Sequence, residues 1–111
     1  MVSVEVVDHG KSVLLVVQGR IDSMTAGQFG ASVTRVIEAG HVRIALDLSL
    51  VDYMSSAGLR ELVSAVKKLR KSAGDLRIAR PSPRVREVME MAGLDTIFLI
   101  FDTPGEAVDS F

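Results

Sequence analysis

The feature of this sequence that most constrains its fold is the alternation of short apolar runs with segments of helical periodicity. Two β-branched runs, residues 2–7 and 13–17, are separated by Asp8-His9-Gly10-Lys11, which has the composition of a tight turn. Beyond this predicted hairpin, helix-like and strand-like segments follow one another to the end of the chain. Such an order lets helices pack onto a mixed sheet through parallel crossovers, so we expect an α/β fold.

The predicted order of elements is β-β-α-β-α-β-α-β-α, with about five strands in a mixed, mostly parallel sheet and about four helices. The later strands are expected at residues 41–48, 76–79 and 97–101. Ser23 and Thr25 are candidate caps for the first helix. The clearest helix follows residues 55–56, because apolar residues recur there every three or four positions from 59 to 69.

Size and composition predict a single domain that spans residues 1–111. Apolar residues make up 48% of the chain and charged residues 24%, which is ordinary globular usage. The absence of cysteine rules out disulfides and thiolate metal sites. The N-terminus lacks the basic start and apolar stretch of a signal peptide, and no apolar run approaches the ~18 residues that span a membrane. We therefore expect a cytoplasmic protein without membrane insertion.

The charges are distributed unevenly although the net charge is only −1. Residues 60–86 contain nine of the thirteen basic residues and only two acidic ones. This segment is either a surface for an anionic partner or a solvated helix face whose charge is balanced elsewhere. Nucleic-acid binders usually combine a net basic domain with a recognisable motif, and this chain has neither, so direct nucleic-acid binding is not expected.

The residues that usually carry catalysis are scattered or missing. His9 and His41 have no second histidine or carboxylate at ligand spacing, so we expect no metal and no cofactor. Ser64-Ala65-Val66-Lys67 matches the Ser-x-x-Lys pattern of penicillin-binding enzymes, but it lies within a predicted helix. A nucleophilic Ser56 would need a general base, and no histidine is suitably placed. We expect no catalytic residues and no enzyme activity.

Two adjacent serines, Ser55 and Ser56, lie where a predicted strand turns into the clearest helix. The first turn of a helix has backbone N–H groups without partners and the positive end of the helix dipole. A hydroxyl there can cap the helix or carry a phosphate. One cap needs only one serine, and Gly58 removes bulk that would hinder another molecule. Arg60, one turn beyond Ser56, can stabilise a phosphate on that serine.

The chain resembles the STAS-domain anti-sigma factor antagonists of bacteria over nearly its whole length. The resemblance rests first on Val51-Asp52-Tyr53-Met54-Ser55-Ser56-Ala57-Gly58-Leu59. It also includes Gly19-Arg20-Ile21-Asp22, Leu46-Asp47-Leu48, Ala92-Gly93-Leu94-Asp95 with Phe98-Leu99-Ile100-Phe101, and Thr103-Pro104-Gly105-Glu106-Ala107. The segment with the two serines is the most specific of these motifs, and the others support it jointly.

The resemblance implies the STAS fold and a partner-switching function. The unphosphorylated antagonist is expected to bind an anti-sigma factor, a serine kinase of the histidine-kinase-like ATPase fold, and so to release a sigma factor. Phosphorylation by that kinase ends the complex, and a phosphatase resets the antagonist. The family's phosphorylated serine lies two residues before the glycine, which is Ser56 here. Ser55 stands where the family often has Asp, and Ala57 where it often has Ser or Thr, so Ser55 is the alternative acceptor.

The same resemblance suggests which residues form the partner-binding surface. Asp22 and Asp52 are candidates together with Ser55, Ala57 and Gly58, whereas their alternative interpretation is as ordinary loop and cap residues. A second functional hypothesis is a STAS module in a lipid-transport or stress-signalling assembly, or a small-ligand binder, that is not regulated by phosphate. The retained serine at position 56 favours the phosphate-regulated antagonist.

Overall fold

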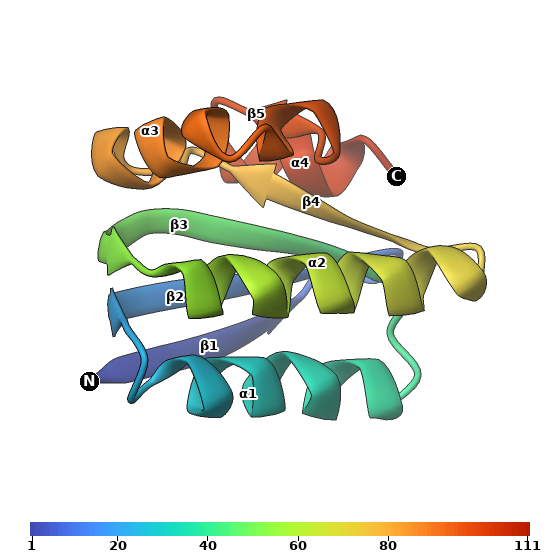
Figure 1. Ribbon diagram of the computed structural model, residues 1–111. Helices are drawn as coiled ribbons and strands as arrows, with labels where there is room; N and C mark the ends of the chain where they lie inside the picture. Colours follow the sequence, from blue (N-terminus) through green and yellow to red (C-terminus); the bar gives the residue numbers. More distant parts are fainter.

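The computed structural model describes all residues 1–111 and has five strands in one sheet, in the spatial order β1-β2-β3-β4-β5 (Figure 1). The strands are β1 (Val2–Asp8), β2 (Val13–Ile21), β3 (Arg43–Met54), β4 (Asp75–Ala79) and β5 (Ile100–Phe101). The helices are α1 (Ala26–Glu38), α2 (Ser56–Lys71), α3 (Pro83–Met91) and α4 (Pro104–Asp109), with a 3-10 turn η1 (Leu94–Thr96). The predicted element order and α/β class are confirmed.

The sheet is mixed because only its first pair of strands is antiparallel. β1 and β2 form a hairpin in which Val2 lies opposite Gly19, and every later pair is parallel. The carboxyl ends of β2 and β3 therefore lie at the same edge of the sheet, with Ile21 paired to Met54. This edge carries both the loop before α1 and the turn before α2, so those two loops are neighbours.

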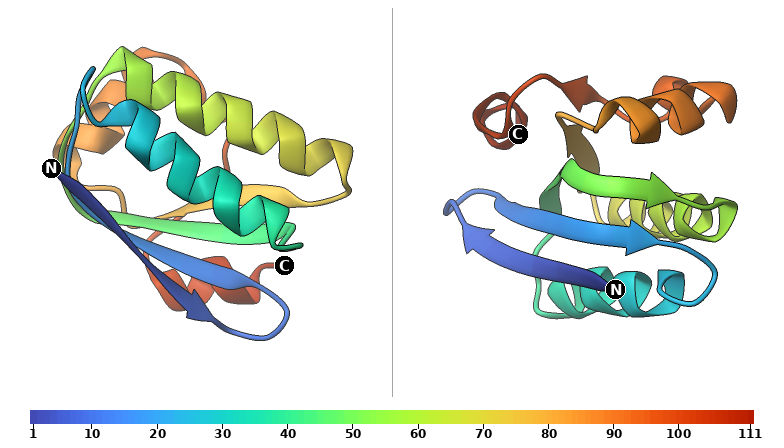
Figure 2. Two further views of the ribbon diagram at one scale, coloured as in Figure 1. Left: turned by 90° about the horizontal axis from the view of Figure 1, so that it is seen from below. Right: turned by 90° about the vertical axis from the view of Figure 1, so that its left-hand side faces the viewer.

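Helices cover the two faces of the sheet unequally (Figure 2). α1, α2 and α3 contribute to one large cluster of buried apolar residues, whereas α4 packs on the opposite face in a small cluster with Ala45 and Ala79. Alternation along β3 explains this division, since Ile44 and Leu46 face the large cluster while Ala45 faces α4. None of the helices combines the length and the apolar character needed to cross a membrane.

Three strands differ from the prediction by more than one residue, and the first of them, β2, continues to Ile21 beyond its predicted end at residue 17. β3 continues through Met54, beyond the predicted end at residue 48, because its last residues pair with the extended end of β2. The strand predicted at 97–101 is wrong for residues 97–99, since only Ile100 and Phe101 are in strand conformation. Gly93 adopts a left-handed conformation and starts the 3-10 turn, so the chain reaches the sheet late. Phe98 is buried while Ile97 and Leu99 stay exposed.

An ion pair between a buried carboxylate and a half-exposed arginine lies on the α4 side of the sheet. The side chain of Asp47 in β3 is only 2% exposed, and both of its carboxylate oxygens accept hydrogen bonds from Arg80, the shortest at 2.9 Å. The backbone N–H of Ser49 donates a further bond at 3.0 Å. Burial by itself raises the pKa of Asp47, but the bonds from Arg80 and Ser49 outweigh it and hold that pKa below its ordinary value.

Candidate functional site

The turn from β3 into α2 is held by Ser55. Its backbone is extended, with φ −85° and ψ 170°, and its Oγ accepts the backbone N–H of Gly58 at 3.3 Å. The backbone N–H of Ser55 in turn donates to the carbonyl of Ile21 at 2.8 Å, which ties the turn to the end of β2. Of the two adjacent serines, Ser55 is therefore the one that caps the helix.

Ser56 occupies the first position of α2 and is exposed, unlike its half-buried neighbour Ser55. Its hydroxyl makes no hydrogen bond within the protein, because the cap bond to the first turn is already made by Ser55. No acidic residue lies in the first turn of α2. The Ser56 hydroxyl is therefore free at a helix end whose dipole favours negative charge.

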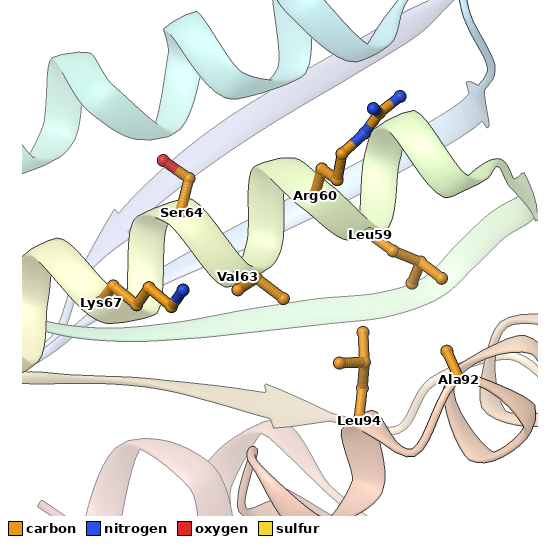
Figure 3. A pocket seen from close by; sticks show the side chains of 7 residues that line it. All are labelled: Leu59, Arg60, Val63, Ser64, Lys67, Ala92 and Leu94. Carbon is orange, nitrogen blue, oxygen red and sulfur yellow. The ribbon is translucent and has the colours of Figure 1, made fainter.

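Arg60 is the cation nearest along the helix to this hydroxyl. It is exposed, and no carboxylate lies within ion-pair distance of it. Figure 3 shows its side chain extending toward the N-terminal end of α2. This direction is the one expected for helical side chains, which lean toward the N-terminus.

Gly58 has a different structural role from the one suggested by the sequence. A Cβ at this position would lie 2.7 Å from Cγ2 of Ile21 and 2.9 Å from Cγ of Met54, both in the protein's own core. The glycine thus lets α2 approach the ends of β2 and β3, and the idea that it clears space for another molecule is wrong. Ala57 beside it is half-buried and packs against the same core.

Gly58→Ala should lower the free energy of unfolding by about 1 kcal/mol, because the overpacking exceeds the gain in helix propensity. Gly27→Ala is the matched control: Gly27 lies in α1, and a Cβ there meets no atom within 4 Å. That substitution should raise the free energy of unfolding by about 0.5–1 kcal/mol. Urea denaturation of both variants measures the difference, and equal stability changes would contradict the packing role of Gly58.

Asp22 organises the loop between β2 and α1. Its carboxylate accepts the backbone N–H groups of Met24 at 2.9 Å and Thr25 at 3.1 Å, and it pairs with Arg20 at 3.3 Å. The bond from Met24 contributes most to holding the pKa of Asp22 below its ordinary value, with further contributions from Thr25 and Arg20. Thr25 is the residue that precedes α1, but its side chain makes no cap bond to the helix, so the predicted cap is wrong. The hydrogen bonds of Asp22 hold this loop together instead.

The edge of the sheet beside the serine turn also carries an aromatic and basic cluster that the sequence did not reveal. The guanidinium of Arg20 lies 4.1 Å from the ring centroid of Tyr53, and that of Arg84 lies 6.0 Å from it. Arg20 and Tyr53 are register partners on β2 and β3, whereas Arg84 comes from α3. The contact between Arg20 and Tyr53 could have been predicted from the sequence only if the register between β2 and β3 had been known. Asp52, the neighbouring residue, is exposed.

Ion pairs account for part of the basic segment 60–86. Arg70 and Arg77 both bind Asp75, at 3.0 and 3.1 Å, and Arg80 binds Asp47. The other cations of the segment form no ion pair, and those on α2 are exposed; they are Arg60, Lys67, Lys68 and Lys71. The segment is thus partly a structural network and partly a free basic surface along α2.

Comparison with known proteins identifies the family. The STAS domain family matches residues 3–107, which is nearly the whole chain. The chain belongs to the STAS domain family. This STAS domain is 30% identical to RsfB, an anti-sigma-F factor antagonist of Mycobacterium tuberculosis, over 107 residues, which are 96% of this chain and 87% of RsfB. It is 37% identical to BtrV of Bordetella bronchiseptica over 94 residues, covering 85% and 81% of the two chains. BtrV is described, provisionally, as an anti-sigma factor antagonist.

A solved structure supports the same relationship. The crystal structure of an anti-sigma factor antagonist from Mycobacterium paratuberculosis superposes on this STAS domain with a TM-score of 0.90 and 27% sequence identity. The match covers 99% of this chain and 93% of the other. The fold and the family that the serine motif suggested are therefore confirmed.

Proposed function

We propose that this STAS domain is an anti-sigma factor antagonist regulated by a phosphate on Ser56. In its unphosphorylated form it binds an anti-sigma factor that is a serine kinase, and this binding releases a sigma factor. Transfer of a phosphate to Ser56 ends the association, and a phosphatase restores the binding form. The observation that carries this proposal is the free, exposed Ser56 hydroxyl beside a capping Ser55.

The division of roles between the two serines favours Ser56 as the acceptor. The Ser55 hydroxyl already accepts the Gly58 N–H, and its backbone N–H and carbonyl are bonded to Ile21 and Leu59. A phosphate on Ser55 would disturb the cap and the entry to α2. A kinase can reach the Ser56 hydroxyl without breaking any hydrogen bond of the protein.

The helix end can hold the phosphate once it is attached. Backbone N–H groups and the helix dipole favour an anion at the N-terminus of α2, and Arg60 supplies a guanidinium one turn away. The first turn contains no acidic residue that would repel the new charge. The phosphorylated protein should therefore keep its fold and change only its surface.

The change of surface explains why the complex would separate. A phosphate adds about −1.5 to −2 charges at neutral pH. Asp22 lies in the loop after β2 and Asp52 near the end of β3, so the added charge lies at the same edge of the sheet as these two carboxylates and the nearby Arg20. If the partner contacts this surface with neutral or apolar groups, forming the complex would require removing water from the phosphate, which costs free energy. If the partner contacts it with negative charges, the phosphate would repel them.

The phosphate transfer itself provides the test. The protein is incubated with ATP and each candidate anti-sigma kinase of its source, and intact mass is measured. We expect the gain of one phosphate in the wild type and in Ser55→Ala, and no gain in Ser56→Ala. Absence of transfer from every such kinase would contradict the proposal and favour a STAS module that is not regulated by phosphate. Transfer retained in Ser56→Ala and lost in Ser55→Ala would reassign the acceptor.

A further inference from the structure

A groove runs between the first half of α2 and the segment that follows α3, beginning one turn after the capped end of the helix. It has a volume of about 540 Å³ and is open to solvent. Leu59 and Val63 on α2 face Ala92 and Leu94 across it (Figure 3). The segment that follows α3 is tied to α2 by Arg70, whose guanidinium donates a hydrogen bond to the carbonyl of Ile97 at 2.6 Å. The groove is therefore a defined depression with apolar walls.

The segment of the chain that supplies Ala92 and Leu94 to this groove also carries exposed apolar side chains. Of the large hydrophobic side chains that are exposed in this protein, three lie in residues 91–99: Met91 at 81%, Ile97 at 38% and Leu99 at 52%. Because β5 begins only at Ile100, Ile97 and Leu99 lie outside the sheet. Exposed apolar groups gathered in one place usually mark a binding surface.

The rim of the groove is basic. Arg60 and Lys67 line it from α2, and neither has a carboxylate within 4.0 Å. Glu90 and Asp95, the acidic residues close in sequence to Ala92 and Leu94, are exposed and do not line the groove. The two cations are seven residues apart, which is two helical turns and about 10 Å along the axis. Carboxylates seven residues apart on another helix have the same spacing.

We propose that this groove binds an amphipathic helix of a partner protein. The apolar face of that helix fills the space between Leu59, Val63 and Leu94, and two carboxylates on its flank pair with Arg60 and Lys67. Helix-in-groove recognition uses apolar anchors at intervals of three, four and seven residues, which suits two turns of α2. The proposal needs no kinase, but it shares Arg60 with the phosphate switch: a phosphate on Ser56 that engages Arg60 would remove one of the two cations from the groove.

Two other occupants fit the observations less well. A small amphiphilic acid would leave much of its surface in water, because the groove is open and ligand sites usually bury most of their ligand. A second copy of this chain, docked with the two-fold axis at the middle of the groove, would bring Arg60 against Lys67 of its mate and so oppose like charges. An acidic helix meets both the apolar walls and the charge of the rim.

A designed peptide tests the proposal on the intact protein. The probe is a synthetic amphipathic helix with leucines at intervals of three and four residues and two glutamates seven residues apart on one flank. Titration into the 15N-labelled protein should shift the amide signals of residues 59–67 and 92–97. The matched peptide with lysines in place of the two glutamates should leave these signals unchanged.

Charge reversal on the protein then separates the groove from general basic attraction. Arg60→Glu/Lys67→Glu should weaken binding of the acidic peptide about tenfold and allow the lysine peptide to bind. Lys68→Glu/Lys71→Glu makes the same charge change on α2 outside the groove and should alter the dissociation constant by less than about twofold. Equal effects of the two double variants would overturn the proposal. So would shifts at the groove caused by decanoate but not by the peptide, or a dimer that protects these residues.

Discussion

Arg80→Leu is expected to lower the free energy of unfolding by about 2 kcal/mol at neutral pH. The substitution leaves the Asp47 carboxylate, whose side chain is 2% exposed, without its guanidinium. Breaking a buried pair by removing one partner typically costs 3–5 kcal/mol, and we reduce this figure because the Arg80 side chain is 53% exposed. Chemical denaturation at pH 7 measures the loss.

The variant and the wild type should respond to pH in opposite directions. In the wild type the pKa of Asp47 is depressed, so its contribution to stability is present above the unfolded value of about 3.9 and is lost as pH falls through the folded pKa. In Arg80→Leu, burial without the guanidinium raises the pKa of Asp47. The free-energy cost of burying the unpaired, charged carboxylate is then present at neutral pH, and it disappears as the carboxyl becomes protonated. The difference in unfolding free energy between the two proteins should therefore shrink from pH 7 to pH 4.

A double variant provides the control for this pair. Asp47→Leu/Arg80→Leu removes both charges and should recover much of the stability lost in Arg80→Leu, because no unpaired carboxylate remains in the sheet. A double variant that recovers none of the stability lost in Arg80→Leu would show that the cost comes from lost packing of the arginine. A difference that is the same at both pH values would contradict the electrostatic explanation.

Ser56→Asp is expected to weaken binding to the anti-sigma kinase about 100-fold if Ser56 carries the switch. A carboxylate at this position adds one negative charge to the proposed binding surface, and the kinase must either desolvate that charge or meet it with a like charge, which costs several kcal/mol across an interface. The fold should not suffer, because an acidic residue at the start of a helix is favourable by about 0.3–1 kcal/mol. Titration calorimetry with the purified kinase gives the affinity, and urea denaturation gives the stability.

The matched control is Ser56→Asn, which has nearly the same shape as Ser56→Asp without the charge. It should bind the kinase more tightly than Ser56→Asp. Equal affinities of the Asn and Asp variants would mean that size, and not charge, ends the association. A loss of stability in Ser56→Asp would instead place the effect in the fold of the β3–α2 turn.

Local sequence rules predicted the parts of the site that depend on a few neighbouring residues. A serine before a strongly periodic helix predicts a cap, and Ser55 makes that cap bond. The serine motif in its position at a strand-to-helix turn also pointed to the family, which the comparison of residues 3–107 confirms. These predictions succeeded because capping and periodicity act within one or two turns of the chain.

The failures concern contacts between residues that are distant in sequence. The place of Gly58 against Ile21 is set by how closely α2 approaches β2, which no local pattern encodes. Residues 97–99 are as apolar as a buried strand, but their pairing depends on where Gly93 turns the chain. The cluster of Arg84 with Tyr53 likewise requires α3 to dock beside the end of β3.

If Ser56 carries the proposed phosphate, the adjacent serines place folding and signalling on different atoms of neighbouring residues. Ser55 is committed to the architecture through its bonds to Gly58 and Ile21, whereas Ser56 contributes no hydrogen bond to it. Evolution can therefore alter position 56 without first compensating for lost stability. A single substitution there would convert a reversible regulator into a permanently active one, so the sensitivity of the response can change faster than the domain that delivers it.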